Sequence, residues 1–186
     1  MPRLDALGAV LLFVVNSNQD PLVARVRQTA YARMDLATSI ARDTAIVGYV
    51  QAKNEQQEPA AEIQKRDARW TAGGEAELRK ELTTSPCAER LRSLVKGDPF
   101  VLEAILMDAQ GALVCATDET SDYWQGDEPK WQKPMQAGLE AFVDEPAFDE
   151  STQAYALQLS VPVLRAGARI GALCLTLKVP RPSAAK

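Results

Sequence analysis

The sequence contains no histidine, and this absence excludes several kinds of active site. Without an imidazole, a chain has no Ser-His-Asp or Cys-His activation of a nucleophile, no His-ligated zinc and no histidine proton shuttle near neutral pH. An enzyme would have to use carboxylates alone, for instance Asp127 and Glu145 as acid and base, and nothing in the sequence sets their separation. We therefore expect a protein that is not an enzyme and that carries no cofactor.

Cysteine and aromatic residues are scarce. Cys87, Cys115 and Cys174 lie far apart and form no C-x-x-C pair, so neither a zinc ribbon nor a redox motif is indicated. Cys115 and Cys174 fall in strand-like runs and are interpreted as small buried apolar residues. Aromatic residues make up 6% of the chain and most of them follow residue 99, so we expect the denser packing in the second half.

Negative charge is concentrated in one segment of the chain. The net charge is −4, but residues 118–150 contain ten Asp and Glu residues against two Lys. An acidic surface of this kind repels phosphate backbones, so we expect no nucleic acid partner there. The segment also lacks the D-x-D-x-D-G spacing of a calcium loop, so no metal site is predicted from its acidic residues Asp118, Glu119, Asp122, Asp127 and Glu128.

The length of 186 residues and the 46% hydrophobic content suit one domain of ordinary size. Residues 6–15 form an apolar run of about ten residues, too short for a bilayer span of ~20 but typical of a signal-peptide core. Asp5 and the lack of an A-x-A cleavage site argue against a signal peptide, and the alternatives are a short packed helix or the remnant of a longer membrane anchor. We expect a signal-like or anchor segment over 1–19, one domain over 20–179 and a disordered tail over 180–186.

The first half of the domain is predicted to be helical. From residue 20 to residue 51, apolar and small residues recur at three- and four-residue steps, which indicates one long helix with Asp20 as cap and Pro21 in its first turn. This helix either packs on a sheet or forms the seam of a homodimer. Further helices are predicted over about 59–72, ending at Gly73-Gly74, around Leu78 and Leu82, and after Ser85-Pro86.

The second half is predicted to form a sheet. Two apolar runs, 100–108 and 112–117, are joined by a turn in which Gly111 supplies the positive φ of a hairpin. Residues 154–164 and 170–179 alternate between apolar and other side chains with period two, as strands with one buried face do. Together with residues 138–143, these runs predict an α+β fold with five antiparallel strands.

Residues 121–131, S-D-Y-W-Q-G-D-E-P-K-W, stand out between these strands. They are too polar for a core helix and too aromatic for an ordinary solvated loop. Acids beside aromatic rings suit a cationic ligand, since an ammonium over a Trp face is worth ~0.5–2 kcal/mol, and Lys130 suits a carboxylate. The stretch therefore predicts a pocket for a zwitterionic amino acid or a small amine. The alternative is that Trp124 and Trp131 close the core while the carboxylates face water.

The order of these elements resembles the PAS-like extracytoplasmic sensor fold called Cache or PDC, over residues 20–179. The resemblance is carried by D-A-Q-G at 108–111, T-S-D-Y-W-Q-G-D-E at 120–128, and S-V-P-V at 160–163 followed by G-A-L at 171–173. It implies a PAS-like five-stranded antiparallel sheet in the order 2-1-5-4-3, with a long N-terminal helix. It also implies a ligand between the sheet and the segment after its second strand, and a pocket wall of Tyr123, Trp124, Asp127, Lys130 and Trp131, with Tyr155 reaching in from the sheet.

The same resemblance implies a function and a location. We expect a single small-molecule-binding sensor domain of a bacterial signal-transduction type, periplasmic or extracytoplasmic, with or without an N-terminal membrane anchor. No second membrane helix, kinase, cyclase or methyl-accepting module follows the last strand, so we expect a membrane-associated signalling partner rather than direct transmembrane signalling through the C-terminus. The alternative is a non-catalytic adaptor or dimerisation module that uses the helix over 20–51.

The implied strand order also predicts the state of the cysteines. Cys115 on the second strand and Cys174 on the fifth are separated by the first strand, which places their Cα atoms about 10 Å apart, beyond the ~7 Å limit of a disulfide. Cys87 precedes the sheet on a helix. We therefore expect all three cysteines to be unpaired, even in an exported protein.

Overall fold

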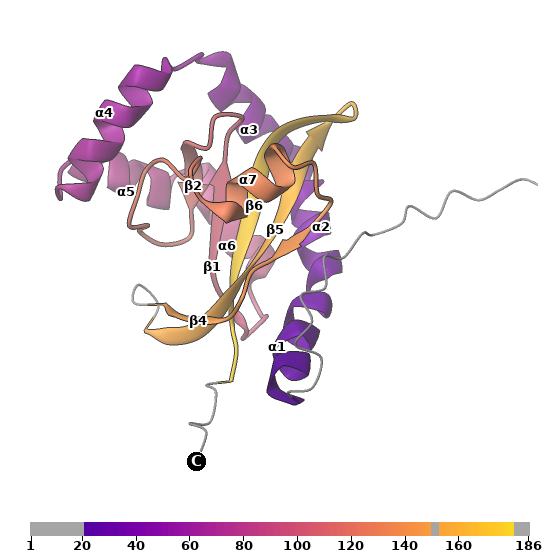
Figure 1. Cartoon of the computed structure of the whole chain (residues 1–186). Coiled ribbons are helices and arrows are strands. Elements are labelled where there is room, and N and C mark those ends of the chain that lie inside the picture. Colours follow the sequence, from indigo (N-terminus) through magenta and orange to yellow (C-terminus); the bar gives the residue numbers. More distant parts are fainter. Residues whose placement is uncertain (1–20, 150–152, 181–186) are drawn as a thin grey trace, which may run out of the picture.

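The computed structural model describes residues 21–149 and 153–180 (Figure 1). Within these ranges six helices come first, and the strands of one sheet follow, interrupted by a seventh helix. Among the described residues, no helix is both long and apolar enough to cross a membrane. The expected signal-like or anchor segment over 1–19, and all but Pro180 of the expected tail, lie outside these residues.

The expected helix over 20–51 is divided into three consecutive helices, α1 (Pro21–Tyr31), α2 (Met34–Ala41) and α3 (Thr44–Glu55). The second break is made by Asp43, which adopts an extended conformation and accepts hydrogen bonds from the backbone N–H groups of Ala45 and Ile46. Asp is a strong N-cap, so it starts a new helix here although the apolar period continues through it. The prediction of one unbroken helix is therefore wrong, because periodicity does not detect an internal cap.

The next three helices agree with the sequence prediction. They are α4 (Ala60–Thr71), α5 (Ala76–Thr84) and α6 (Pro86–Val95). Gly73 follows α4 with a φ of 82°, a left-handed conformation that glycine adopts without strain. The Ser85 hydroxyl accepts a hydrogen bond from the Ala88 N–H, and Pro86 occupies the first turn of α6.

The sheet confirms the predicted fold class and strand order. The strands and the helix between them are β1 (Val101–Met107), β2 (Leu113–Ala116), α7 (Pro129–Met135), β3 (Phe142–Val143), β4 (Ala147–Asp149), β5 (Ala154–Arg165) and β6 (Ala168–Lys178). The strands are antiparallel, in the order β2-β1-β6-β5-β3, and the additional short strand β4 also pairs with β5. Gly111 lies in the β1–β2 hairpin turn with a φ of 85°.

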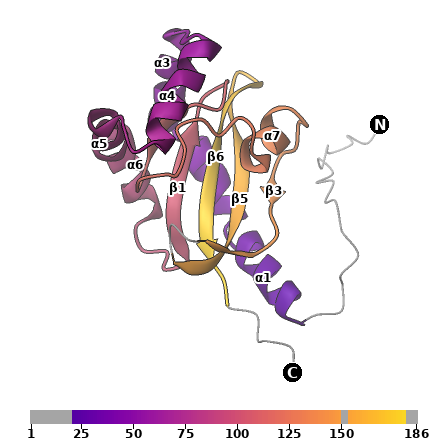
Figure 2. The same cartoon turned by 60° about the vertical axis from the view of Figure 1, so that its left-hand side comes forward.

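The two faces of the sheet pack against different elements. One face, which includes Leu159 and Leu175, packs against the buried side chains of α1, α2, α3 and α6. The other face, which includes Ile105 and Cys174, packs against Tyr123 and Trp131 from the segment after β2. Figures 1 and 2 show α1, α2 and α3 on one side of the sheet and α7 on the other. The buried side chains described on these helices, from Val26 to Val50, thus pack against the sheet.

The structure contradicts the prediction for two of the three cysteines. Cys87 and Cys115 form a disulfide, with Cα atoms 6.0 Å apart, while Cys174 is free and buried. The prediction considered distances between strands, but Cys87 lies on the buried face of α6, which packs directly on β2. The helix therefore brings Cys87 to the sheet. The expected separation of Cys115 from Cys174 holds, because β1 lies between β2 and β6.

Thiol titration tests this pairing. Under denaturing, non-reducing conditions we expect one reactive thiol, from Cys174, and three after reduction. Replacing Cys87 and Cys115 together by serine should lower the free energy of unfolding by about 2–4 kcal/mol, because the disulfide closes a loop in the unfolded chain. As a control, Cys174→Ala should abolish the reactive thiol and leave the disulfide in place. Three reactive thiols before reduction would contradict the pairing.

Candidate functional site

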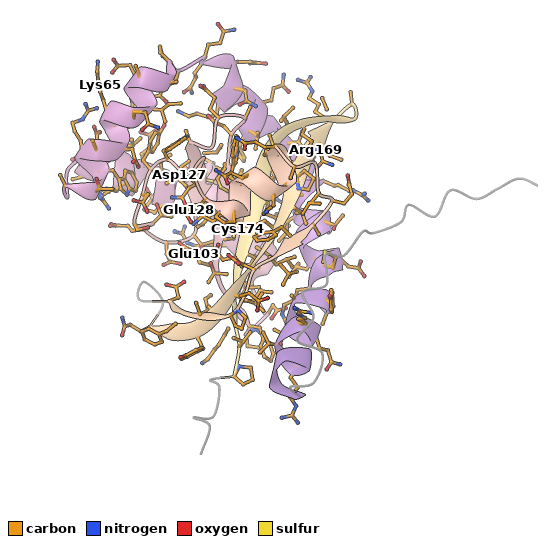
Figure 3. The ribbon with its side chains drawn as sticks, viewed as in Figure 1. Lys65, Glu103, Asp127, Glu128, Arg169 and Cys174 are labelled. Carbon is orange, nitrogen blue, oxygen red and sulfur yellow. A yellow bond between two sulfur atoms is a disulfide. The ribbon has the colours of Figure 1, made fainter. Side chains whose placement is uncertain are left out.

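A cavity of about 290 Å³ lies between one end of the sheet and the segment that leads into α7. The sheet contributes side chains from β1, β4 and β5, and the segment contributes side chains from both of its ends. Figure 3 labels Glu103 and Glu128, which lie near each other towards the middle of the molecule. The lining residues are Glu103, Ile105, Thr120, Ser121, Glu128, Lys130, Asp149 and Gln158.

A larger hollow of about 490 Å³ lies where α6 meets β1 and the end of β2, and it has a different character. Most of its lining side chains are exposed, including Glu89, Ser93 and Lys96. The Arg92 guanidinium in it donates hydrogen bonds to the Thr83 and Thr117 carbonyls, which ties α6 to its neighbours. The smaller cavity is the stronger candidate, because it is lined by charged side chains that the fold buries.

Lys130 is the buried cation of the cavity. It lies in the first turn of α7, after the extended Glu128 and after Pro129, which suits that position in a helix. Only 6% of its surface is exposed, and its Nζ lies 3.0 Å from Glu128 Oε2. Lysine is rarely buried to this extent, because desolvating an ammonium group costs several kcal/mol unless it is paired.

Two contacts hold α7 and thereby position Lys130. The buried Trp131 indole donates a hydrogen bond of 3.0 Å from Nε1 to the Asp108 carbonyl. At the other end of the helix, the Arg169 guanidinium of β6 donates to carbonyl groups of Pro134 and of the loop that follows α7, and it pairs with Glu140. A cation that satisfies carbonyls at a helix C-terminus stabilises that end. The short helix is therefore held near both of its ends.

Glu103 is the buried anion of the cavity. It lies on β1 with 7% of its surface exposed, and Thr176 on the adjacent β6 donates a hydrogen bond of 3.3 Å to its Oε2. Burial raises the pKa of Glu103 from 4.5 to about 7, with smaller contributions in the same direction from Asp149 and Asp118. Lys130 and the Thr176 hydroxyl oppose this rise in pKa. Glu103 therefore changes its charge near neutral pH.

The cavity combines groups of both charges. Lys130 can bind a carboxylate, while Glu103, Glu128 and Asp149 can accept hydrogen bonds from an ammonium group. The hydroxyl groups of Thr120 and Ser121 and the Gln158 amide add neutral polar groups. The volume of about 290 Å³ lies just below the range of ~300–1,000 Å³ that small-molecule sites occupy. Among the described residues, no group of three or more cysteine and acidic side chains is arranged to hold a metal ion.

The structure brings Lys130, alone among the six predicted site residues, to the lining of this cavity. Tyr123 is fully buried, and its hydroxyl donates a hydrogen bond of 3.0 Å to Glu58 Oε2. The Trp124 indole donates to the Gln110 carbonyl at 2.7 Å, and Trp131 contacts Asp108 as described above. Trp131 is buried and Trp124 is half-buried, and both indole N–H groups are used on backbone carbonyls.

The other two predicted residues also lie away from the cavity lining. The Asp127 side chain is exposed to solvent. Tyr155 packs with Leu157 and Leu159 on the face of β5 that meets the N-terminal helices, and its ring lies 5.8 Å from the Phe148 ring. Because successive strand residues point to opposite faces, Gln158 faces the cavity and Tyr155 does not.

Helix α4 holds the segment between β2 and α7. One carboxylate oxygen of Asp67 accepts hydrogen bonds from the backbone N–H groups of Tyr123 and Trp124, at 3.0 and 2.9 Å. The buried Trp70 indole donates to the Thr120 carbonyl at 3.0 Å. In Figure 1, α4 stands off the strands of the sheet, beside this segment. The backbone next to Ser121 is thus positioned by a helix from the first half of the chain.

Sequence reasoning missed Glu103, Asp149 and Asp67 as residues of this region. A usable signal existed for Glu103, which is a lone acid in the apolar strand V-L-E-A-I-L-M. An acidic residue at a position whose neighbours along the same face are Ile105 and Met107 is expected to be buried. No local signal marks Asp67 or Asp149, since each meets the segment or the cavity only through the tertiary fold.

No protein-family model matches the sequence, and no curated protein sequence matches it significantly. Similar solved structures include the E. coli DcuS sensor domain, with a TM-score of 0.46 and 13% identity, covering 83% of this chain and 92% of that one. The sensor domain of the V. cholerae histidine kinase DctB has a TM-score of 0.42 and 11% identity, covering 84% of this chain and 53% of that one. The ligand-binding domain of the Pseudomonas aeruginosa amino acid chemoreceptor PctC, in complex with GABA, has a TM-score of 0.40 and 17% identity, covering 69% of this chain and 62% of that one.

These three neighbours are sensor or ligand-binding domains, the kind of domain that the sequence resembles. This chain spans about half the length of the DctB domain and less than two thirds of the PctC domain. At these identities and TM-scores, the likeness assigns neither a ligand nor a function to this chain.

The buried carboxyl group of Glu103 predicts a pH-dependent stability without any ligand. Its folded-state pKa of about 7 lies above the value of 4.5 for a free side chain, so the fold is disfavoured as Glu103 ionises. Relative to Glu103→Gln, the wild-type protein should therefore lose up to about 3 kcal/mol of stability as the pH rises from 4.5 through 7. Urea unfolding at a series of pH values measures this difference.

Thr176→Val is the matched control for that series, since it removes the hydrogen bond and keeps the carboxyl group. It should retain the pH dependence that Glu103→Gln abolishes. A stability difference between wild type and Glu103→Gln that stays constant over this pH range would show that Glu103 is not the titrating group.

Proposed function

We propose that this chain is a small-molecule-binding sensor domain of a bacterial signal-transduction protein, of the Cache or PDC kind. Its ligand is a zwitterionic amino acid or a small amine that binds in the cavity between β1, β5 and the segment that leads into α7. The observation that carries the proposal is that a buried lysine and a buried glutamate, Lys130 and Glu103, line the same cavity.

Two such charges are costly for the fold and suit a binding role. A buried ionised group destabilises a protein unless hydrogen bonds and an opposite charge compensate for its lost hydration. Lys130 forms an ion pair with Glu128, and Glu103 accepts a hydrogen bond from the Thr176 hydroxyl at the long distance of 3.3 Å. A ligand with an ammonium and a carboxylate group would supply both with charged partners. A buried carboxyl group with a raised pKa inside a cavity, as Glu103 is, is a frequent mark of a functional site.

The same chemistry supports binding rather than catalysis. The lining groups can hold the two ends of a ligand, but they include no activated nucleophile, and the chain has no histidine to activate one. A binding role requires complementary charge and shape, which this cavity supplies. We therefore infer that the domain recognises its ligand without transforming it.

An extracytoplasmic location is supported by the disulfide between Cys87 and Cys115, since such bonds persist in oxidising compartments and are rare in the cytosol. The first helix begins and the last strand ends at the same end of the sheet in Figures 1 and 2, which suits attachment to one surface. The proposed partners are the small-molecule ligand and a membrane-associated signalling protein.

A homodimer through residues 20–51 would have to use the outward face of these helices. Their inward residues, such as Ala37 and Ile40, are buried against the sheet and are not available for a second copy. Exposed side chains on the outward face include Tyr31 and Asp35. The adaptor or dimerisation alternative therefore depends on a more polar surface than the sequence suggested.

Thermal melting against a ligand panel tests the proposed function. The panel contains the proteinogenic amino acids, GABA, putrescine and succinate. At about 100 times its dissociation constant, a ligand adds ~2.7 kcal/mol of stability. We expect at least one amino acid or amine to raise the melting temperature and succinate to have no effect.

Two lysines on α7 provide a matched pair of variants for a ligand that carries a carboxylate. Lys130→Met should remove most of the ligand-induced stabilisation, because it deletes the buried cation and keeps the length of the side chain. Lys133→Met, which changes an exposed residue of the same helix, should retain the stabilisation. The proposal is contradicted if no compound stabilises the wild-type protein, or if an amino acid stabilises both variants equally.

A further inference from the structure

Glu103 lines the cavity, and several elements place charged groups around it. Lys130 and Glu128 face it from α7 and its N-cap, Asp149 from β4, and Asp118 from the segment after β2. The Cys174 thiol of β6 lies nearby, on the sheet face that includes Ile105, and burial raises its pKa to about 11. Glu103 is more deeply buried than the other carboxylates of the cavity, Glu128 and Asp149.

We propose that Glu103 determines the specificity of this site for ligands with an ammonium group, and that it gives up its proton when such a ligand binds. This inference rests on the proposed function, whose cavity and ligand class it specifies further. It assigns a role to a residue on the sheet, outside the segment from which the sequence predicted most of the pocket.

The chemistry follows from the two forms of a buried carboxyl group. An ionised carboxylate accepts charge-assisted hydrogen bonds from an ammonium group, whereas a protonated carboxyl group presents an O–H donor and no compensating charge. Burial holds a large fraction of Glu103 in the protonated form near neutral pH, since its pKa is about 7. An ammonium ligand therefore binds with loss of the carboxyl proton to solvent, and the charge of the complex balances.

The Lys130–Glu128 pair makes this role specific to Glu103. Glu128 Oε2 lies 3.0 Å from Lys130 Nζ, so its charge is already directed towards a cation. Glu103, by contrast, accepts a hydrogen bond from the uncharged Thr176 hydroxyl. An incoming ammonium group is then the complementary partner for Glu103, and an anionic ligand would bind better when Glu103 is protonated.

The affinity of an ammonium ligand should accordingly rise with pH. If the ionised fraction of Glu103 sets the binding-competent fraction, the affinity at about pH 5.5 should be roughly 30-fold weaker than at about pH 8. Isothermal titration calorimetry with the panel compounds measures this ratio, with GABA, putrescine and succinate as probes that are zwitterionic, cationic and anionic. Titration in buffers of different ionisation enthalpy should show proton release on binding below pH 7.

Variants assign the effect to Glu103. Glu103→Gln should bind the ammonium compound at least about tenfold more weakly than wild type at pH 8, with no dependence on pH, since an amide carries no charge. Glu119→Gln changes an exposed carboxylate between β2 and α7, whose partner is Arg79, and should retain the wild-type affinity and pH dependence.

The outcomes separate this inference from the proposed function. If a compound binds with the same affinity at both pH values, or equally to wild type and Glu103→Gln, the inference is overturned and the proposed function stands. If no compound of the panel binds at either pH, the proposed function is overturned and this inference with it. Proton release together with the loss of pH dependence in Glu103→Gln supports both.

Discussion

The arrangement of the site depends on one physical constraint, the burial of opposite charges at the polar end of an otherwise apolar sheet face. Glu103 and Lys130 are each more than nine-tenths buried, so both side chains lose most of their hydration on folding. The surrounding structure compensates with a hydroxyl group, a paired carboxylate and a cavity into which both side chains face. A fold that only needed stability would be better served by apolar residues at these two positions.

The remaining contacts hold the two walls of the cavity in place. Arg169 and Trp131 fix α7 to the sheet, and Asp67 and Trp70 fix the preceding segment to α4. The disulfide joins α6 to β2 on the opposite face. Functional groups held by such surrounding contacts need little rearrangement when a ligand binds, which reduces the entropic cost of binding.

Much of the fold could be predicted from the sequence, because local signals determine it. The alternation of apolar and other side chains in β5 and β6, with the turn at Gly111, predicted the sheet. The three- and four-residue spacing of apolar side chains from residue 20 predicted helix that packs on one face of the sheet. The helix N-cap at Asp43 was missed, because the regular spacing of apolar residues continues through it. The Cys87–Cys115 disulfide was missed, because the distances between strands do not show where helix α6 packs. At the site, Lys130 was predicted and lines the cavity, whereas Trp124 and Trp131 use their N–H groups on carbonyls of the chain. Glu103 and Asp149 reach the cavity only through strand pairing.

The central claim is that one small molecule occupies the cavity between Glu103 and Lys130. Its most direct test is a crystal structure of the protein grown with the panel compound that stabilises it most. We expect density for that compound in the cavity, with its ammonium group within hydrogen-bond distance of Glu103 and, where it has one, its carboxylate on Lys130. An unoccupied cavity in crystals saturated with a compound that raises the melting temperature, or density at a different place on the protein, would contradict the account.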